Sequence, residues 1–197
     1  RMQAKQYTEA CTCYTEALQL YPNDAHLHYC KGVAHHNGKQ LLEAIGCYCQ
    51  ALKINPKLAE AFENLAAAQT ELNLFTDSLL SIKAAVELRP KKDANHAQLA
   101  RTLIRLGLFN QALKAATDAI DLAPKNAINY MIRSDAYRGL NQLSQSIADL
   151  RQAITIDPNN AEFPYNLSFD LLLSEQFKEG WYCYESRFQT ENFLKNN

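Results

Sequence analysis

Small and large side chains recur along the chain in a pattern with a period of 34 residues. A small residue is followed four positions later by a larger, mostly apolar one and seven positions later by alanine, which is the spacing of one face of an α-helix. The small residues that begin the pattern are Ala10, Ala44, Ser78, Ala112, Ser146 and Gly180. The larger residues are Tyr14, Tyr48, Ile82, Leu150 and Tyr184, with Ala116 as the exception, and the alanines are Ala17, Ala51, Ala85, Ala119 and Ala153. We predict that this helical face is buried.

A second pattern precedes the first one in each period and predicts another helix. Its positions follow the i, i+3, i+4, i+7 spacing, as in Phe62, Leu65, Ala66 and Gln69. Each period is therefore predicted to be a hairpin of two helices. The residues expected at the bends, where a positive φ is needed, are Gly38, Asn73, Gly107 and Asn141.

Five prolines mark the ends of these hairpins. Pro22, Pro56, Pro90, Pro124 and Pro158 follow one another at intervals of 34 residues, and proline ends a helix because it lacks an amide hydrogen and has a fixed φ. The predicted units are a partial one at about residues 1–24 and further ones at 25–58, 59–92, 93–126, 127–160 and 161–197. Because repeat arrays bury their core between neighbouring units, an array that begins in mid-unit is expected to be a fragment with further sequence upstream.

The columns of small and large residues, the paired alanines and the closing proline resemble the tetratricopeptide repeat family over essentially the whole chain. The resemblance implies an all-α fold, a right-handed α-solenoid of about six stacked helix-turn-helix units whose first helices line a concave groove. Four residues depart from the family pattern: Lys31 and Arg133 occupy a column that is usually apolar, Pro164 replaces an aromatic residue, and Arg187 replaces an alanine. We expect looser packing in those units.

The composition favours a folded, soluble protein. Hydrophobic residues make up 47% of the chain and charged residues 21%, with a formal net charge of -1, so neither nucleic acid nor an anionic membrane is a default partner. The apolar runs fall far short of the roughly 20 residues that span a bilayer. Six cysteines in a chain of this length are interpreted as free thiols in a reducing cytoplasm, which predicts a cytoplasmic location.

The sequence contains no recognisable reaction centre, so we predict no enzymatic activity, no cofactor and no metal site. Cys47 and Cys49 are two positions apart on a predicted helix and point to different sides, so they are poorly placed to share a metal. Cysteines a full repeat apart, such as Cys13 and Cys47, could be neighbours on stacked helices, and packing is the favoured interpretation. Four nearby histidines are not expected to converge, because two fall in core columns and two on the groove side; they are His28 and His35, then His26 and His36.

The predicted groove is the candidate binding surface. Its acidic residues concentrate in one unit and its arginines in the next two, so a ligand with an acidic segment flanked by apolar residues would complement it. The alternative is that Glu63 and Arg101 neutralise each other between adjacent helices. The residues predicted to bind a peptide are Tyr29, Val33, Asn64, Ala67, Gln98, Arg101, Arg105, Met131, Arg138, Tyr165 and Phe169.

Two groove types known within the repeat family match this chain poorly. The clamp for acidic chaperone tails uses lysines, asparagines and an arginine at positions where this chain has mainly Tyr29, Val33, Glu63, Ala67 and Gln98. The asparagine ladder of the sugar transferases that modify serine and threonine is matched only by Asn64 and Asn166.

The last predicted unit, 161–197, resembles the closing repeat of bacterial chains in which such repeats precede a glycosyltransferase domain, through Gly180-Trp181, Tyr184-Glu185 and Arg187. Its second helix presents large apolar residues where a terminal helix should be polar. These residues are Trp181, Tyr182, Phe188, Phe193 and Leu194. A downstream domain, a partner, a second copy of the chain, or residues 189–197 themselves would cover them.

The function predicted from the sequence is that of a protein-interaction scaffold that binds a peptide or partner protein in its concave groove. The alternative is the substrate-recruiting region of a larger bacterial glycosyltransferase whose catalytic domain lies outside this chain. Self-association through the C-terminal helix is a third hypothesis.

Overall fold

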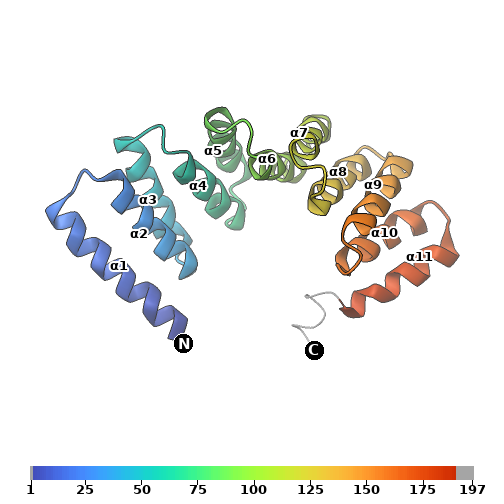
Figure 1. Ribbon diagram of the computed structural model, residues 1–197, viewed down its shortest axis with the longest axis horizontal. Helices are drawn as coiled ribbons and strands as arrows, with labels where there is room; N and C mark the ends of the chain where they lie inside the picture. Colours follow the sequence, from blue (N-terminus) through green and yellow to red (C-terminus); the bar gives the residue numbers. More distant parts are fainter. Residues whose placement is uncertain (1, 190–197) are drawn as a thin grey trace. The chain divides into compact units, whose positions relative to one another are not determined.

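The computed structural model describes residues 2–189, and in this range the chain is all helical, with no strand (Figure 1). Eleven α-helices are followed by one short 3-10 helix, η1. Their bounds are α1 Met2–Leu20, α2 Ala25–Asn37, α3 Leu41–Ile54, α4 Ala59–Glu71, α5 Phe75–Leu88, α6 Asp93–Arg105, α7 Phe109–Leu122, α8 Ala127–Gly139, α9 Leu143–Ile156, α10 Glu162–Leu173, α11 Phe177–Tyr184 and η1 Glu185–Gln189. The predicted all-α repeat solenoid is confirmed.

The chain divides into two compact units, residues 1–91 and 92–197. Unit 1 contains α1 to α5, and unit 2 contains α6 to η1. In both units, the helix that opens a hairpin, here called a first helix, alternates with the helix that closes it, called a second helix. The first helices are α2, α4, α6, α8 and α10, and the second helices are α1, α3, α5, α7, α9 and α11. The repeat boundaries given above remain a prediction.

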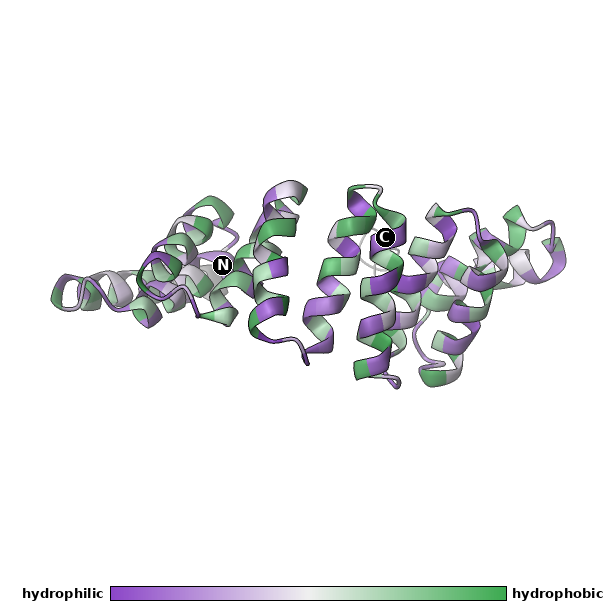
Figure 2. Ribbon diagram, turned by 90° about the horizontal axis from the view of Figure 1, so that it is seen from above, coloured by the Kyte–Doolittle hydropathy of each residue, from purple (hydrophilic) through white to green (hydrophobic). Residues whose placement is uncertain are grey.

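The core lies between the helices, where the predicted columns of small and large residues meet. The small residues Ala44, Ser78, Ala112 and Ser146 are fully buried, and so are the large ones at Tyr48, Ile82 and Leu150. Hydrophobic and hydrophilic residues both occur along each helix (Figure 2), because each helix packs its apolar residues against neighbouring helices and leaves the others facing solvent.

Close approach of α2 to α3 depends on one glycine. A Cβ atom at Gly32 would lie 2.6 Å from the ring of Tyr48, which is itself fully buried and has no room to move. A side chain at this position would therefore overpack the core.

The second helices end where the sequence predicts, and side chains cap the start of two first helices. α1, α3, α5, α7 and α9 each end two residues before one of the five regularly spaced prolines. At the start of α2, the Asp24 carboxylate accepts hydrogen bonds from the amides of His26 (2.8 Å) and Leu27 (3.1 Å), and Asn126 caps α8 in the same way through the amide of Ile128 (3.2 Å). Such caps satisfy amides that have no partner inside the helix.

The bend prediction is correct at Asn73, Gly107 and Asn141, which have φ angles of 60°, 73° and 58°, and wrong at Gly38. Gly38 has a φ of -77°, and the left-handed residue is the next one, Lys39, with a φ of 60°. The 34-residue period itself points to Lys39, because this residue precedes Asn73 by one full repeat. Glu175 continues the column with a φ of 63°.

Candidate functional site

The predicted binding residues all lie on first helices, and the structure buries none of them completely. They form two sets that are described separately. The unit 1 face consists of Tyr29, Val33, Asn64 and Ala67 on α2 and α4, and the unit 2 face consists of Gln98, Arg101, Arg105, Met131, Arg138, Tyr165 and Phe169 on α6, α8 and α10.

On the unit 1 face, the structure brings Tyr29 and Asn64 together. The Asn64 side-chain amide donates a hydrogen bond to the Tyr29 hydroxyl across 3.1 Å, and this joins α4 to α2. The Tyr29 ring also lies 6.1 Å from the ring of Tyr48 on α3. Burial raises the pKa of the Tyr29 hydroxyl, so this group is neutral and acts as a hydrogen-bonding partner.

The C-terminal ends of α2 and α4 are joined by a polar cluster that the sequence analysis missed. Glu71 accepts hydrogen bonds from His36 Nε2 at 2.9 Å and from Lys39 Nζ at 3.0 Å. These two hydrogen bonds hold the pKa of the Glu71 carboxyl below its usual range. The other ring nitrogen of His36 lies 3.4 Å from the Tyr48 hydroxyl. Glu71 follows His36 by 35 residues, about one repeat, and this spacing was the signal that could have placed the two side chains on neighbouring first helices.

The acidic residues at the start of α4 have a basic partner inside unit 1. Arg89, which follows α5, forms an ion pair with Glu60 and lies 3.7 Å from Glu63 Oε1. The negative charge predicted for this part of the groove is therefore partly neutralised by Arg89.

On the unit 2 face, Arg138 is held by a buried carboxylate that the sequence analysis did not identify. Arg138 Nε lies 2.5 Å from Asp170 Oδ1, and Arg138 Nη1 lies 3.1 Å from Asp135 Oδ1. Asp170 is fully buried on α10 and also accepts a hydrogen bond from the Ser146 hydroxyl at 2.5 Å. Asp170 occupies the column of Ala34, Ala68 and Ala136, and a carboxylate in that column needs a cation nearby. Arg138 is therefore engaged within unit 2.

The remaining arginines of the unit 2 face, Arg101 and Arg105, are exposed on α6. Arg101 acts electrostatically on Asp135 of α8: burial raises the pKa of Asp135, and the positive charges of Arg138 and Arg101 oppose this rise. The solvent-facing positive charge of this face thus lies mainly on α6.

The far end of the unit 2 face is aromatic. Tyr165 and Phe169 are in edge-to-face contact at 4.9 Å, and both contact the ring of Tyr184 on α11, at 5.8 and 6.2 Å. Next to them, the Asn166 side-chain amide donates to Met131 Sδ at 3.3 Å. Asn64 and Asn166, the two residues that match the asparagine ladder, therefore both contact the preceding first helix.

With this geometry established, comparison with known families assigns the chain. A model described as TPR repeat matches residues 1–38 and 135–168, and a model described as tetratricopeptide repeat matches residues 25–58 and 95–126. Together the matched segments span more than half of the chain. The chain belongs to the tetratricopeptide repeat family. No curated protein matches it in sequence.

Solved structures of other tetratricopeptide repeat (TPR) proteins share the fold. Residues 41 to the end of MamA from Desulfovibrio magneticus RS-1 superpose with a TM-score of 0.75 at 17% identity, covering 88% of this chain and 97% of that one. YrrB, described as a TPR protein with an unusual peptide-binding site, gives 0.73 at 14% identity, covering 91% and 92%. A thermophilic TPR protein from Thermus thermophilus gives 0.69 at 22% identity, covering 85% and 92%.

One departure from the TPR pattern is compensated inside the hairpin of α8 and α9. The Arg133 guanidinium donates two hydrogen bonds of 2.8 Å each to the Asp149 carboxylate and also contacts the rings of Tyr130 and Tyr137. The guanidinium at this departure from the pattern is therefore paired inside its own hairpin, and the looser packing expected there stays a prediction.

The histidines and cysteines of this TPR chain have different surroundings: His36 belongs to the polar cluster around Glu71, Cys11 is buried and Cys13 is exposed. Within residues 2–189, no three His, Cys, Asp or Glu side chains are arranged to hold a metal ion, and all six cysteines are free. Burial raises the pKa of the thiols of Cys11, Cys30, Cys47 and Cys183, which lowers their reactivity. In the same range, no helix is both long and apolar enough to cross a membrane.

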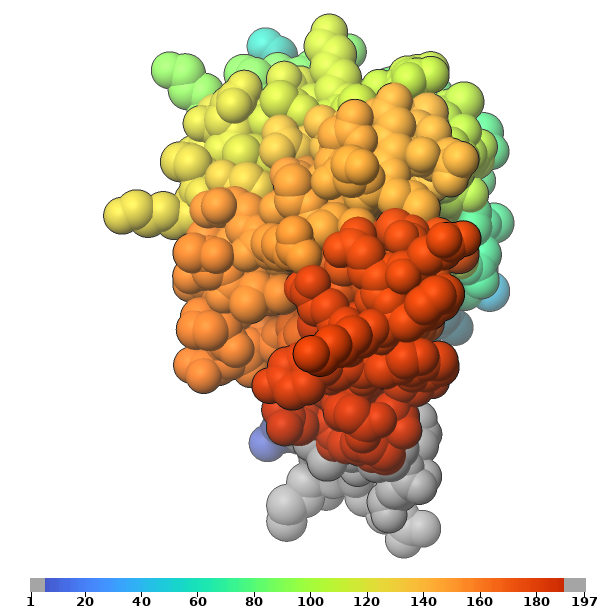
Figure 3. All heavy atoms as spheres, turned by 90° about the vertical axis from the view of Figure 1, so that its right-hand side faces the viewer, coloured from blue at the N-terminus to red at the C-terminus, as the bar shows by residue number. Residues whose placement is uncertain are grey.

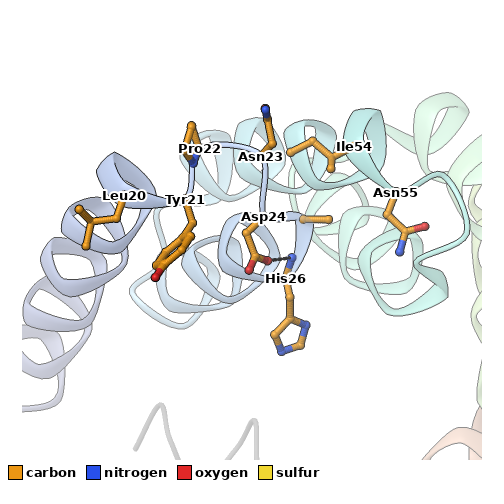
Figure 4. Close-up of a pocket in the computed structure, with 9 residues that line it drawn as sticks. Leu20, Tyr21, Pro22, Asn23, Asp24, His26, Ile54 and Asn55 are labelled. Atoms are coloured by element: carbon orange, nitrogen blue, oxygen red, sulfur yellow. Dashed lines mark hydrogen bonds between the residues drawn. The ribbon is translucent and has the colours of Figure 1, made fainter.

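Unit 1 also has a shallow pocket of about 660 Å³, at the loop between α1 and α2 (Figure 4). Leu20, Tyr21 and Ile54 form part of its wall, and Asp24 is engaged in capping α2. None of the predicted binding residues lines this pocket, so it is separate from the unit 1 face.

Proposed function

We propose that this TPR chain is a non-catalytic scaffold that binds a peptide or a partner protein along its first helices. Membership of the repeat family and the peptide-binding site named for YrrB support a protein-interaction role. Stacked helices hold the contacting side chains in place before binding, so less conformational entropy is lost when the ligand binds.

We further propose that the unit 2 face binds a ligand with acidic and apolar side chains. The supporting observation is that exposed Arg101 lies on α6 while Phe169, with 36% of its surface exposed, lies on α10 of the same unit. Arg138 is engaged with Asp170, so it has a structural role here and positions the face. Acidic groups of the ligand would lie near α6, and an apolar side chain would contact Tyr165 and Phe169.

The test uses a fluorescent peptide selected on the immobilised chain from a library of short peptides that combine Asp or Glu with Leu or Phe. In the double variant Arg101→Glu/Arg105→Glu, the affinity for the selected peptide should fall at least about tenfold while helical content stays constant. The matched control is Lys114→Glu/Lys125→Glu, which changes the net charge equally at exposed residues on α7 and in the loop after it.

Equal loss of affinity in both double variants would show that only net charge matters and would contradict the proposed face. Unchanged affinity in the α6 double variant would also contradict it. Loss in that variant alone supports it. Fluorescence anisotropy should also show weaker binding of the peptide at the higher of two salt concentrations, because salt screens the contacts between exposed charges.

A role as the recruiting region of a glycosyltransferase remains a prediction from the last repeat. The family models matched to this chain end at residue 168, before the residues that carry that resemblance.

A further inference from the structure

Three consecutive first helices of unit 2 each place one residue in a shared column of the repeat. Arg101 of α6, Asp135 of α8 and Phe169 of α10 follow one another at intervals of 34 residues. In unit 1 the same column holds the apolar residues Val33 and Ala67. Side chains of one column recur at the same place on successive repeats, so the unit 2 face carries a positive, a negative and an aromatic group in that order.

Of the two carboxylates beside Arg138, Asp135 is the one that a ligand can reach. The Asp135 side chain is 39% exposed, whereas that of Asp170 is 0% exposed. Arg138 pairs with Asp170 through Nε and donates from Nη1 to Asp135 Oδ1 at 3.1 Å. Within residues 2–189, this is the one hydrogen bond that the Asp135 carboxylate accepts, so its second oxygen, Oδ2, is available to a ligand.

The charged groups around Asp135 balance one another. Arg101 and Arg138 supply two positive charges, and Asp135 and Asp170 supply two negative ones. Burial and the charge of Asp170 raise the pKa of the Asp135 carboxyl, and the two arginines oppose this rise. An acidic side chain of a ligand at Arg101 would add a negative charge close to Asp135, and a basic side chain of the same ligand would restore the balance.

The packing of the first helices sets the distance between these groups. α6 contacts α8, and Arg138 joins α8 to α10 through Asp170. Figure 3 views unit 2 from its C-terminal end and shows the atoms of successive helices in contact, from yellow to red. Packed helices lie about 8–10 Å apart, and an extended chain advances about 3.3 Å per residue. An extended ligand therefore meets a new first helix about every three residues.

We propose that the unit 2 face binds an extended peptide that carries an acidic, a basic and an apolar side chain at intervals of about three residues. The acidic side chain pairs with Arg101, the basic one pairs with Asp135 Oδ2, and the apolar one contacts Phe169, which is 36% exposed. Asp135 is then the residue that selects for a basic side chain. This inference rests on the function proposed above for the unit 2 face, and it adds the basic position and the order of the three groups.

The test begins with a display library of nine-residue peptides in which every position is Glu, Lys, Gln, Phe, Ala or Gly. Selection on the immobilised 197-residue chain should enrich peptides in which Glu, Lys and Phe are three residues apart, with Lys in the middle. The same selection on the Asp135→Asn variant should enrich Glu and Phe without a preference for Lys over Gln at the middle position, because the carboxylate that pairs with Lys is absent.

A double-mutant cycle with the most enriched peptide, labelled with fluorescein, measures the contact itself. Changing the peptide's Lys to Gln, or Asp135 to Asn, should each weaken binding about fivefold, and both changes together should weaken it no more than either alone. Asp135→Asn keeps Oδ1 as an acceptor for Arg138, so the fold should not change, which circular dichroism checks. The matched control is Asp121→Asn, which removes a negative charge from an exposed residue of α7 and should bind the peptide like the unchanged chain.

The outcomes separate this inference from the function on which it rests. Enrichment of Glu and Phe without Lys, enrichment at another spacing, or losses that are independent in the cycle would overturn the basic position at Asp135 and leave the acidic and apolar contacts in place. An equal loss in Asp121→Asn would show an effect of net charge and would overturn it as well. If no peptide is enriched, or if the enriched peptides bind the Arg101→Glu/Arg105→Glu variant unchanged, the proposed function and this inference are both wrong.

Discussion

Two regions of the chain that are three repeat periods apart join adjacent first helices through different polar contacts. In unit 1, α2 and α4 are joined by Glu71, a carboxylate with 41% of its side chain exposed, which lies 2.9 Å from the mostly buried His36 and 3.0 Å from the exposed Lys39. In unit 2, α8 and α10 are joined by Arg138 and the fully buried Asp170. His36 and Arg138 share one column of the repeat, whereas the counterpart of Asp170 is a buried alanine, Ala68.

The difference shows that the apolar columns set the packing in both regions, while the polar residues determine how firmly neighbouring repeats are joined. An exposed ion pair contributes little because water and salt screen it. A buried pair makes each partner depend on the other, since either charge left alone would be buried without compensation. The comparison therefore predicts different sensitivity to mutation in the two units.

The largest expected effect comes from removing the buried carboxylate. Asp170→Ala restores the alanine that three of the other four repeats have at this position. It leaves the partly buried Arg138 guanidinium without its main partner and should destabilise α8 to α10 by about 3 kcal/mol or more. Hydrogen exchange of amides in these helices is the measurement, because repeat proteins can unfold in parts.

A double variant separates the charge from the packing. In Arg138→Leu/Asp170→Ala neither member of this pair is left without the other, so most of the lost stability should return. The predicted difference between the two units is wrong if Asp170→Ala alone lowers the free energy of unfolding by less than about 1 kcal/mol. It is also wrong if the double variant is no more stable than Asp170→Ala.

The sequence predicted the hairpins and their core because both follow from periodicity. The five prolines and the small residues at Ala44 and Ser146 recur at a fixed interval, and a helical face with that spacing has to be buried. The helix ends before the prolines and the buried columns of α3, α5, α7 and α9 are as predicted, whereas Ala10, Tyr14 and Ala17 of α1 and Tyr184 of α11 are only partly buried. Family membership, predicted from the same columns, is confirmed by the family models.

The partners of polar side chains were not predicted, because they depend on contacts between repeats that spacing alone does not give. Arg138 was assigned to ligand binding from its helical face, yet its guanidinium contacts Asp135 and Asp170. The signal was present in the alignment of repeats, where Asp170 stands in an alanine column. The Gly38 bend was misplaced for a related reason, since glycine identity was given more weight than the period that marks Lys39.

A smaller effect is expected at the surface cluster of unit 1. Glu71→Gln should cost at most about 1 kcal/mol at neutral pH, because Glu71 and Lys39 are largely exposed. Since its hydrogen bonds with His36 and Lys39 lower the pKa of Glu71, the native carboxylate stabilises the fold above the ordinary value of 4.5, and this contribution is lost as the pH falls through the lowered pKa. Unfolding measured at neutral and at acidic pH should show the two proteins converge in acid. A difference that grows on acidification would contradict this assignment.

The smallest expected effects are at the two bends that place a charged residue in the left-handed region, one in each unit. Glu175 has a φ of 63° and Lys39 a φ of 60°, and a side chain with a Cβ is strained there. Glu175→Gly should therefore raise stability by about 0.5 kcal/mol, the relief of strain exceeding the added entropy of the unfolded chain.

Lys39→Gly relieves the same strain but also removes the ion pair with Glu71 at 3.0 Å, so its net effect should be close to zero. Combining each glycine substitution with Glu71→Gln sharpens the comparison. Lys39→Gly should become stabilising in that background, because the ion pair is already absent, while the gain from Glu175→Gly in the other unit should not change. Thermal unfolding of the four variants against their parents measures these differences, and a Glu175→Gly variant less stable than its parent would show that the bend is not strained.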